Sequence, residues 1–124
     1  MELKFYFCRH CGNIIVYMKS SGVKVICCGE EMQPLLPKTQ DLGQEKHVPV
    51  ITKIGNKVTV KVGSIEHPMV AEHYIQWIIL QTKKGYQKID LQPNQKPEAT
   101  FYIDADDEVE TAYEYCSVHG LWSA

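Results

Sequence analysis

The sequence predicts an all-β protein made of a small metal-bound N-terminal module and a larger antiparallel β-sandwich of immunoglobulin type. Four of the five cysteines stand among the first 28 residues, so a bound metal ion could organise this short segment. The remaining chain carries roughly six or seven short apolar runs, with turns roughly every 8 to 12 residues, which favours a sandwich. No window shows the period of an amphipathic helix. A closed barrel stays open as an alternative because its strands have similar spacing.

The strands of the larger part follow from alternation and turn chemistry. The run KVTVKV at 57–62 alternates strictly, so its three valines share one face of a half-buried strand. The run VPVITKI at 48–54 precedes it, and the Gly55–Asn56 pair between the two runs is typical of a two-residue hairpin turn. Further strands are expected at 73–82, 86–91, 98–103 and 109–115.

Composition divides the chain near Pro37. In the stretch 35–44, Pro37 and Gly43 flank polar residues, a composition typical of linkers. We therefore expect a metal-bound domain over 1–36, a linker over 37–44 and a β-sandwich domain over 45–124. A module of roughly 36 residues has too little apolar surface to fold well on its own core. A metal ion would serve as that core.

Charge and hydropathy argue against two classes of partner. The 13 basic and 15 acidic residues give a formal charge of −2, and Arg9 is the only arginine, so nucleic-acid binding is not expected. The longest apolar run, 77–80, is far too short to cross a membrane, and the N-terminal residues lack the layout of a signal peptide. We therefore expect a cytoplasmic protein. Structural disulfides are rare in that reducing compartment, which leaves metal binding as the main explanation for the cysteines.

The N-terminal cysteines have the spacing of a tetrahedral thiolate site. Cys8 and Cys11 form a C-x-x-C pair, and Cys27 and Cys28 follow as an adjacent pair. Four thiolates suit zinc or iron, and ligand softness alone does not choose between these metals. Zinc ribbons normally use two C-x-x-C pairs, so the adjacent pair must bend the backbone sharply and distort the tetrahedron. The alternative is that these cysteines are simply buried or free thiols.

A second metal site is predicted from four histidines and the last cysteine. His47, His67, His73 and His119 each lie near the expected end of a strand, and Cys116 precedes His119 by three residues. Taken singly, each histidine is better explained as a surface or core residue. Taken together, four imidazoles and a thiolate are five ligands, one more than a closed tetrahedral zinc site holds. On a six-coordinate ion they would leave one position open. Imidazole suits iron, zinc or copper, and a thiolate on iron favours redox chemistry on a small oxygen species.

The segments around these residues resemble a known family. EKHVPV, GSIEHPM, EHYIQWI and EYCSVHG follow in order behind a head whose cysteine pattern is similar to desulforedoxin. The chain thus resembles the desulfoferrodoxins, two-iron superoxide reductases with a desulforedoxin-like head and a neelaredoxin-like domain. The resemblance covers nearly the whole chain and implies two iron ions. One would be an Fe(Cys)4 centre on the four N-terminal cysteines. The other would be a ferrous centre with four equatorial histidines, His47, His67, His73 and His119, and Cys116 as the axial ligand.

The resemblance also implies roles for two residues beside His47. Lys46 would attract superoxide and help to protonate the peroxide product, and Glu45 would take the sixth position on ferric iron. Without the resemblance, both residues look like solvated linker charges. The implied activity is one-electron reduction of superoxide to hydrogen peroxide without oxygen release, a detoxification under oxidative stress. The family further implies re-reduction by rubredoxin or a similar external electron donor, and a homodimer.

Two other classes of function stay open from the residues themselves. One is a zinc ribbon joined to an immunoglobulin-like binding domain, in which the histidines are incidental. The other is an electron-transfer protein in which both metal ions are coordinatively closed. Metal content and the visible spectrum distinguish the first from an iron enzyme, and binding of azide or cyanide distinguishes the second.

Overall fold

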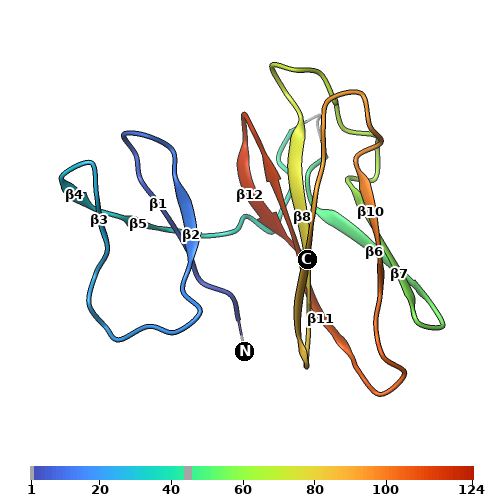
Figure 1. Cartoon of the computed structure of the whole chain (residues 1–124). Coiled ribbons are helices and arrows are strands. Elements are labelled where there is room, and N and C mark those ends of the chain that lie inside the picture. The colour runs from blue at the N-terminus through green and yellow to red at the C-terminus, as the bar shows by residue number, and fades with distance from the viewer. Residues whose placement is uncertain (1, 44–45) are drawn as a thin grey trace. The chain divides into compact units, whose positions relative to one another are not determined.

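The computed structural model describes residues 2–43 and 46–124, and these residues form twelve strands and no helix (Figure 1). All paired strands run antiparallel. The all-β class predicted from the sequence is therefore confirmed. No helix long and apolar enough to span a membrane occurs in the described ranges. The chain divides into two compact units, Met1–Leu36 and Pro37–Ala124.

The first unit holds two small sheets. Three short strands form one sheet in the order β2-β1-β5, and the hairpin β3-β4 forms the other. The bounds are β1 Phe5–Phe7, β2 Ile14–Val16, β3 Ile26–Cys27, β4 Glu30–Glu31 and β5 Gln33–Leu35. The buried apolar side chains among the described residues of this unit are Phe5, Cys8 and Met32. So small a core is consistent with a unit that a metal ion stabilises.

The second unit is a sandwich of two antiparallel sheets, as predicted. One sheet has the strand order β10-β7-β6 and the other the order β12-β11-β8-β9. The bounds are β6 Pro49–Ile54, β7 Lys57–Val62, β8 Ile75–Thr82, β9 Gly85–Asp90, β10 Glu98–Tyr102, β11 Val109–Cys116 and β12 Gly120–Ser123. Figure 1 shows β8, β11 and β12 side by side in one sheet, with β6, β7 and β10 together in the other.

The core of this unit lies between the two sheets. The three valines of β7 are at most 1% exposed, as the alternating pattern predicted. They belong to one cluster with Phe101 of β10 and with apolar residues of β8 and β11. Each fully buried aliphatic side chain contributes roughly 1.5–3 kcal/mol. The predicted tight turn is also confirmed, because Ile54 pairs with Lys57 across Gly55, whose φ is 60°.

Residues 37–43, expected to be part of a linker, instead belong to the second unit. Lys38 forms an isolated parallel bridge with Trp122 of β12. Its backbone N–H donates to the Leu121 carbonyl and its carbonyl accepts the Ser123 N–H, both at 2.9 Å. These bonds use backbone atoms, so the polar side chains of the segment gave no sign of them. The second compact unit therefore begins at Pro37.

Candidate metal centres

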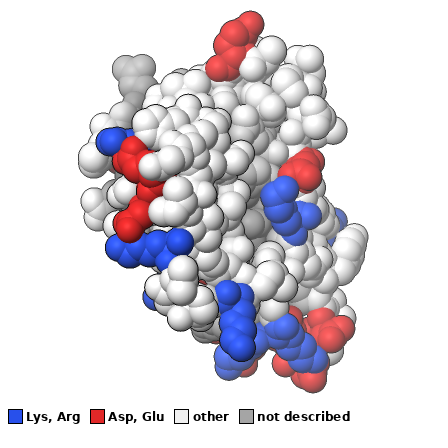
Figure 2. Space-filling model, turned by 60° about the vertical axis from the view of Figure 1, so that its left-hand side comes forward, with Lys and Arg blue, Asp and Glu red and all other residues white. Residues whose placement is uncertain are grey.

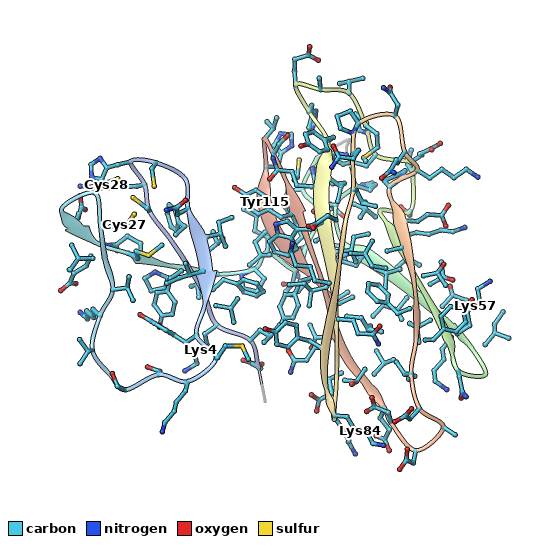
Figure 3. All side chains as sticks on the ribbon, viewed as in Figure 1. Lys4, Cys27, Cys28, Lys57, Lys84 and Tyr115 are labelled. Carbon is cyan, nitrogen blue, oxygen red and sulfur yellow. The ribbon has the colours of Figure 1, made fainter. Side chains whose placement is uncertain are left out.

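The four N-terminal cysteines come together in the first unit. One sulfur atom from each of Cys8, Cys11, Cys27 and Cys28 lies within 4.8 Å of the others. Figure 3 shows sulfur atoms gathered beside the labelled Cys27 and Cys28. The Cys11 and Cys27 sulfurs are 3.6 Å apart. Two thiolates on a tetrahedral ion, with metal–sulfur bonds of about 2.3 Å, lie about 3.8 Å apart, so the donor set fits one tetrahedral metal ion.

Two tight turns present these thiols. Cys8 follows β1, and its carbonyl accepts the Gly12 N–H while its own N–H donates to the Asn13 carbonyl, both at 2.9 Å. In the other turn, between β3 and β4, Cys28 has a φ of 53°. A left-handed backbone is uncommon for a residue with a Cβ. The sharp bend predicted for the adjacent cysteine pair is thus confirmed.

The thiols differ widely in acidity. The backbone N–H of Cys11 holds the pKa of Cys8 down at about 6. The contact with the Cys11 side chain raises the pKa of Cys28 to about 12 and also raises the pKa of Cys27. Each added thiolate repels those already present, so the group cannot lose all its protons near neutral pH by itself. A bound cation removes that repulsion, which is a second reason to place a metal ion here.

A charged cluster joins the two turns. Glu30 on β4 lies 2.6 Å from Nε2 of His10, and its two oxygens lie 2.8 and 3.0 Å from the Arg9 guanidinium. Arg9 and His10 stand inside the first cysteine pair, whereas Glu30 stands two residues after Cys28. The contact with His10 holds the pKa of Glu30 below its usual range. The ionised carboxylate therefore ties together the two turns that carry the thiols.

The four remaining histidines and Cys116 come together at one end of the sandwich. Their ligand atoms lie within 4.8 Å of one another. His47 precedes β6, His67 and His73 lie between β7 and β8, Cys116 ends β11, and His119 lies in the turn to β12. These positions meet because β6 pairs with β7, and β8 with β11. His47, His67 and Cys116 are buried, with 4%, 3% and 0% exposure.

The four imidazole rings form a closed cycle. Centroids of neighbouring rings are 4.7 Å apart for His47 and His67, 4.8 Å for His67 and His73, 5.0 Å for His73 and His119, and 4.8 Å for His119 and His47. The planes of neighbouring rings are inclined by 66° to 87°. Four rings at nearly equal spacing therefore surround one point. This is the arrangement that an equatorial plane of four nitrogen ligands requires.

The donor atoms also have the spacing that a metal ion requires. The Nε2 atoms of His47 and His67 are 3.1 Å apart. Two nitrogens at right angles on a metal ion, with bonds of about 2.1 Å, lie about 3.0 Å apart. The Cys116 sulfur lies 3.6 Å from His67 Nε2 and 3.8 Å from His119 Nδ1. Five such donors exceed a tetrahedral site and fit a five- or six-coordinate ion.

Hydrogen bonds from the surrounding chain orient these donors. Nδ1 of His67 lies 2.7 Å from the Pro68 carbonyl oxygen. That nitrogen must therefore carry the proton, which leaves Nε2 to bind a metal ion. The backbone N–H of His119 donates to the Cys116 sulfur at 3.4 Å. Such a bond favours the thiolate, the form in which cysteine binds metals.

Asp41 fixes the backbone at His47. Its carboxylate accepts the N–H of His47 at 2.6 Å and the N–H of Val48 at 3.1 Å. Hydrogen bonds to a charged group contribute roughly 1.5–3 kcal/mol each. Sequence reasoning missed this residue because a single aspartate in a polar stretch looks like part of a linker. Its only signal is a carboxylate six residues before a histidine, which is too weak to select it.

Trp122 packs against the histidine cycle. Its ring stacks on His47 with 4.6 Å between centroids and 11° between planes. Its Nε1 donates to the His119 carbonyl at 3.2 Å. Trp122 is only 7% exposed, so the stacked face is removed from water. This aromatic contact therefore restrains two of the four histidines.

Lys46, expected to act beside His47, lies in the loop directly before it. Its Nζ donates to the Gly43 carbonyl at 3.2 Å. Gly63 lies against the same loop, because a Cβ added at Gly63 would stand 2.3 Å from the Lys46 carbonyl oxygen. Glycine is therefore the residue that lets the two backbone segments approach. Glu45, the other residue expected to act here, lies outside the described residues.

The fold and the two groups of donors together define a class of protein. An all-β chain with one four-thiol group and one group of four imidazoles and a thiol is a two-centre, non-haem metalloprotein. A family model described as desulfoferrodoxin matches residues 39–124. The chain belongs to the desulfoferrodoxin family, as the resemblance in its sequence indicated. The two groups of donors are consistent with the two iron sites of that family.

Similar proteins cover nearly all of this chain. A desulfoferrodoxin of Nitratidesulfovibrio vulgaris strain Hildenborough is 45% identical over 123 residues, which are 99% of this chain and 96% of the relative. The crystal structure of the superoxide reductase from Treponema pallidum has 40% identity and a TM-score of 0.84, and the match covers 99% of this chain and 98% of that one. A superoxide reductase of Pyrococcus abyssi is 37% identical in an alignment of 103 positions that covers 68% of this chain and 89% of the relative.

Proposed function

We propose that this chain is a superoxide reductase, an oxidoreductase that converts superoxide to hydrogen peroxide without releasing oxygen. The observation that carries the proposal is the group of four imidazoles and one thiol within 4.8 Å. The likeness to proteins named superoxide reductase supports it. In the proposed reaction each superoxide takes up one electron and two protons and becomes one hydrogen peroxide.

The proposed ligands are the four ring nitrogens of the histidine cycle and the Cys116 sulfur. Ferrous iron, if held by this set, would supply the electron that superoxide accepts. The chain offers five donors, so a six-coordinate ion held by them would keep one position for a small anion. Cys116 is fully buried and its sulfur accepts the His119 N–H. Its thiolate would donate electron density toward a bound metal ion, as thiolate ligands do.

The chain must also admit an anion to the histidine cycle. A cavity of about 680 Å³ borders His47 and His119. Lys46 adjoins His47, and its Nζ bonds the carbonyl of Gly43, which lines the same cavity. A cation beside such a site raises the association rate of an anion about tenfold or more. We assign to Lys46 the attraction of superoxide and the donation of a proton to the product.

The proposed enzyme needs one electron from outside for every superoxide it reduces. We infer a rubredoxin or a similar small protein as the donor, and a homodimer working in the cytoplasm, as the family resemblance implies. The four-cysteine group would hold the second iron, which stabilises the first unit. That unit offers few buried apolar side chains of its own among its described residues.

A stoichiometric assay tests the proposal. Iron-loaded, pre-reduced protein is mixed with a pulse of superoxide while peroxide and oxygen are measured. The proposal predicts one peroxide for each superoxide and no oxygen. A dismutase would release one oxygen for every two superoxides, and that yield would refute the proposal.

Two cysteine variants connect the activity to the histidine cycle. Cys116→Ser removes the thiolate of this group and is expected to slow superoxide reduction at least about tenfold. Cys11→Ser is the matched control, because Cys11 belongs to the four-cysteine group in the other unit. It is expected to leave the reaction of superoxide with the pre-reduced protein unchanged. Equal loss in both variants would show that the reaction does not take place at the histidine cycle.

A further inference from the structure

We propose that Lys38 is a second cation that guides superoxide to the histidine cycle, in addition to Lys46. This inference rests on the proposed function. From the sequence alone, Lys38 belongs to a polar linker with no role. In the structure it lines the cavity that also borders His47 and His119.

The ammonium group of Lys38 is held close to two of the histidines. Its Nζ donates to the His119 carbonyl at 2.9 Å. The same ammonium lies 5.1 Å from the ring centroid of Trp122, a distance typical of cation–π contacts. Trp122 stacks on His47 at 4.6 Å between centroids. The ammonium of Lys38 therefore contacts the main chain of His119 directly and is separated from His47 by the ring of Trp122.

The backbone of Lys38 fixes where this charge stands. Lys38 bridges Trp122 and exchanges backbone hydrogen bonds of 2.9 Å with Leu121 and Ser123. A lysine on an unpaired linker would distribute its charge over many conformers. A lysine on a paired backbone keeps its ammonium near the cavity. Because these bonds use main-chain atoms only, a substitution of the side chain leaves them in place.

The local charge matters because a formal net charge of −2 gives an anion no overall attraction to the protein. The formal net charge is −2, and Figure 2 shows cationic and anionic side chains interspersed on one face. Association of an anion therefore depends on cations near the site. The described residues that line the cavity are Lys38, Thr39, Gln40, Leu42, Gly43, His47, His119 and Trp122. Among them, Lys38 is the one whose side chain is permanently charged.

An acidic residue of the same segment makes this cation more important. Asp41 stands three residues after Lys38, its carboxylate accepts the backbone N–H groups of His47 and Val48, and one of its oxygens lies 3.7 Å from Nδ1 of His47. That carboxylate opposes the approach of superoxide. The ammonium of Lys38 offsets this field on the side of the cavity.

Two substitutions at Lys38 separate charge from packing. Lys38→Gln removes the charge but keeps a donor for the His119 carbonyl, whereas Lys38→Arg keeps both. The rate constant for superoxide with pre-reduced, iron-loaded protein is measured at low ionic strength. We expect Lys38→Gln to be slower by about two- to fivefold, and Lys38→Arg to stay within about twofold of the parent. At about 1 M salt the Debye length is about 3 Å, so the difference should disappear.

Lys57→Gln is the matched control for net charge. Lys57 lies at the turn of the β6–β7 hairpin (Figure 3), while the opposite end of that hairpin pairs Pro49 with Val62 next to the site. We expect this variant to react at the parental rate. Equal slowing by Lys57→Gln and Lys38→Gln would overturn the inference, because it would reflect net charge alone. Equal slowing by Lys38→Arg, or no slowing by Lys38→Gln, would overturn it as well.

Azide gives a readout that does not depend on turnover. Azide is titrated into oxidised, iron-loaded protein and followed by the visible spectrum. We expect Lys38→Gln to weaken azide binding by about two- to fivefold, and to leave binding of neutral nitric oxide to the reduced protein unchanged. Equal azide affinities would overturn the inference. If the parent protein binds azide but forms no peroxide, the proposed function is refuted. In that case, weaker azide binding by Lys38→Gln would still support the attraction of anions by Lys38.

Discussion

Replacing Gly63 by alanine should displace the loop that carries Lys46 and His47. Gly63 has a φ of 80°, and a Cβ added there would stand 2.3 Å from the Lys46 carbonyl oxygen and 2.9 Å from that of Ile65. Both neighbours are backbone atoms, which cannot rotate away as the end of a flexible side chain can. The loop before His47 must therefore move for an alanine to fit.

The destabilisation has two parts that a control can separate. A left-handed backbone costs an alanine roughly 1–2 kcal/mol. Overcrowding in a packed region adds about 1–3 kcal/mol. Gly63→Ala should thus lose about 2–5 kcal/mol of unfolding free energy. Gly55→Ala is the matched control, because its φ is 60° and no atom lies within 4 Å of the added Cβ, so only the first part applies.

Urea unfolding followed by tryptophan fluorescence measures this difference in the relevant unit. Both tryptophans, Trp77 and Trp122, belong to the second unit. We expect Gly63→Ala to lose at least about 1 kcal/mol more than Gly55→Ala, and to react more slowly with superoxide. Equal losses with equal rates would refute the reasoning that Gly63 positions the loop of Lys46.

Three further predictions concern other residues. Asp41→Ala leaves the backbone N–H groups of His47 and Val48 without their acceptor, so unfolding assays should show a loss of about 3–6 kcal/mol, and metal analysis should show less bound iron; parental values in both would contradict the assignment. Glu114 is fully buried, and burial raises its pKa to about 9, above the ordinary value of 4.5. The contribution of neutral Glu114 to the unfolding free energy of the protein is fully present below that ordinary value and is lost as pH rises toward 9. Glu114→Gln should therefore flatten the fall of unfolding free energy between about pH 5 and 9. An unchanged slope would argue against a neutral buried carboxyl. Cys28→Ser should release metal from the first unit to a chelator at least about tenfold faster while the iron of the histidine cycle stays bound; equal release rates would mean that Cys28 is not a ligand.

The strands and the donor groups could be predicted because their signals are local or chemically rare. Strict alternation over 57–62 fixed which valines face the core, and their burial confirms it. The adjacent Cys27–Cys28 pair requires a bend, and Cys28 has the positive φ that makes it. Four clustered cysteines, and histidines at strand ends, are difficult to explain without metal ions. These signals need no knowledge of long-range contacts.

The supporting residues could not be predicted because their contacts are distant or made by the backbone. Lys38 bonds the carbonyl of His119, 81 residues away, and nothing in its neighbourhood marks that pairing. Asp41 binds backbone N–H groups, which every residue except proline possesses. Gly63 is required by the approach of another segment as well as by its own positive φ, and the sequence does not reveal that approach. The paired backbone at Lys38 could not be predicted for the same reason, since polar side chains give no sign of backbone pairing.

The central claim is that four imidazoles and one thiolate bind the same iron ion. Anomalous diffraction from crystals, recorded above and below the iron absorption edge, tests it directly. The account predicts an iron peak inside the cycle of His47, His67, His73 and His119, within bonding distance of the Cys116 sulfur. No peak inside the cycle, or a peak that changes at the zinc edge and not at the iron edge, would contradict it.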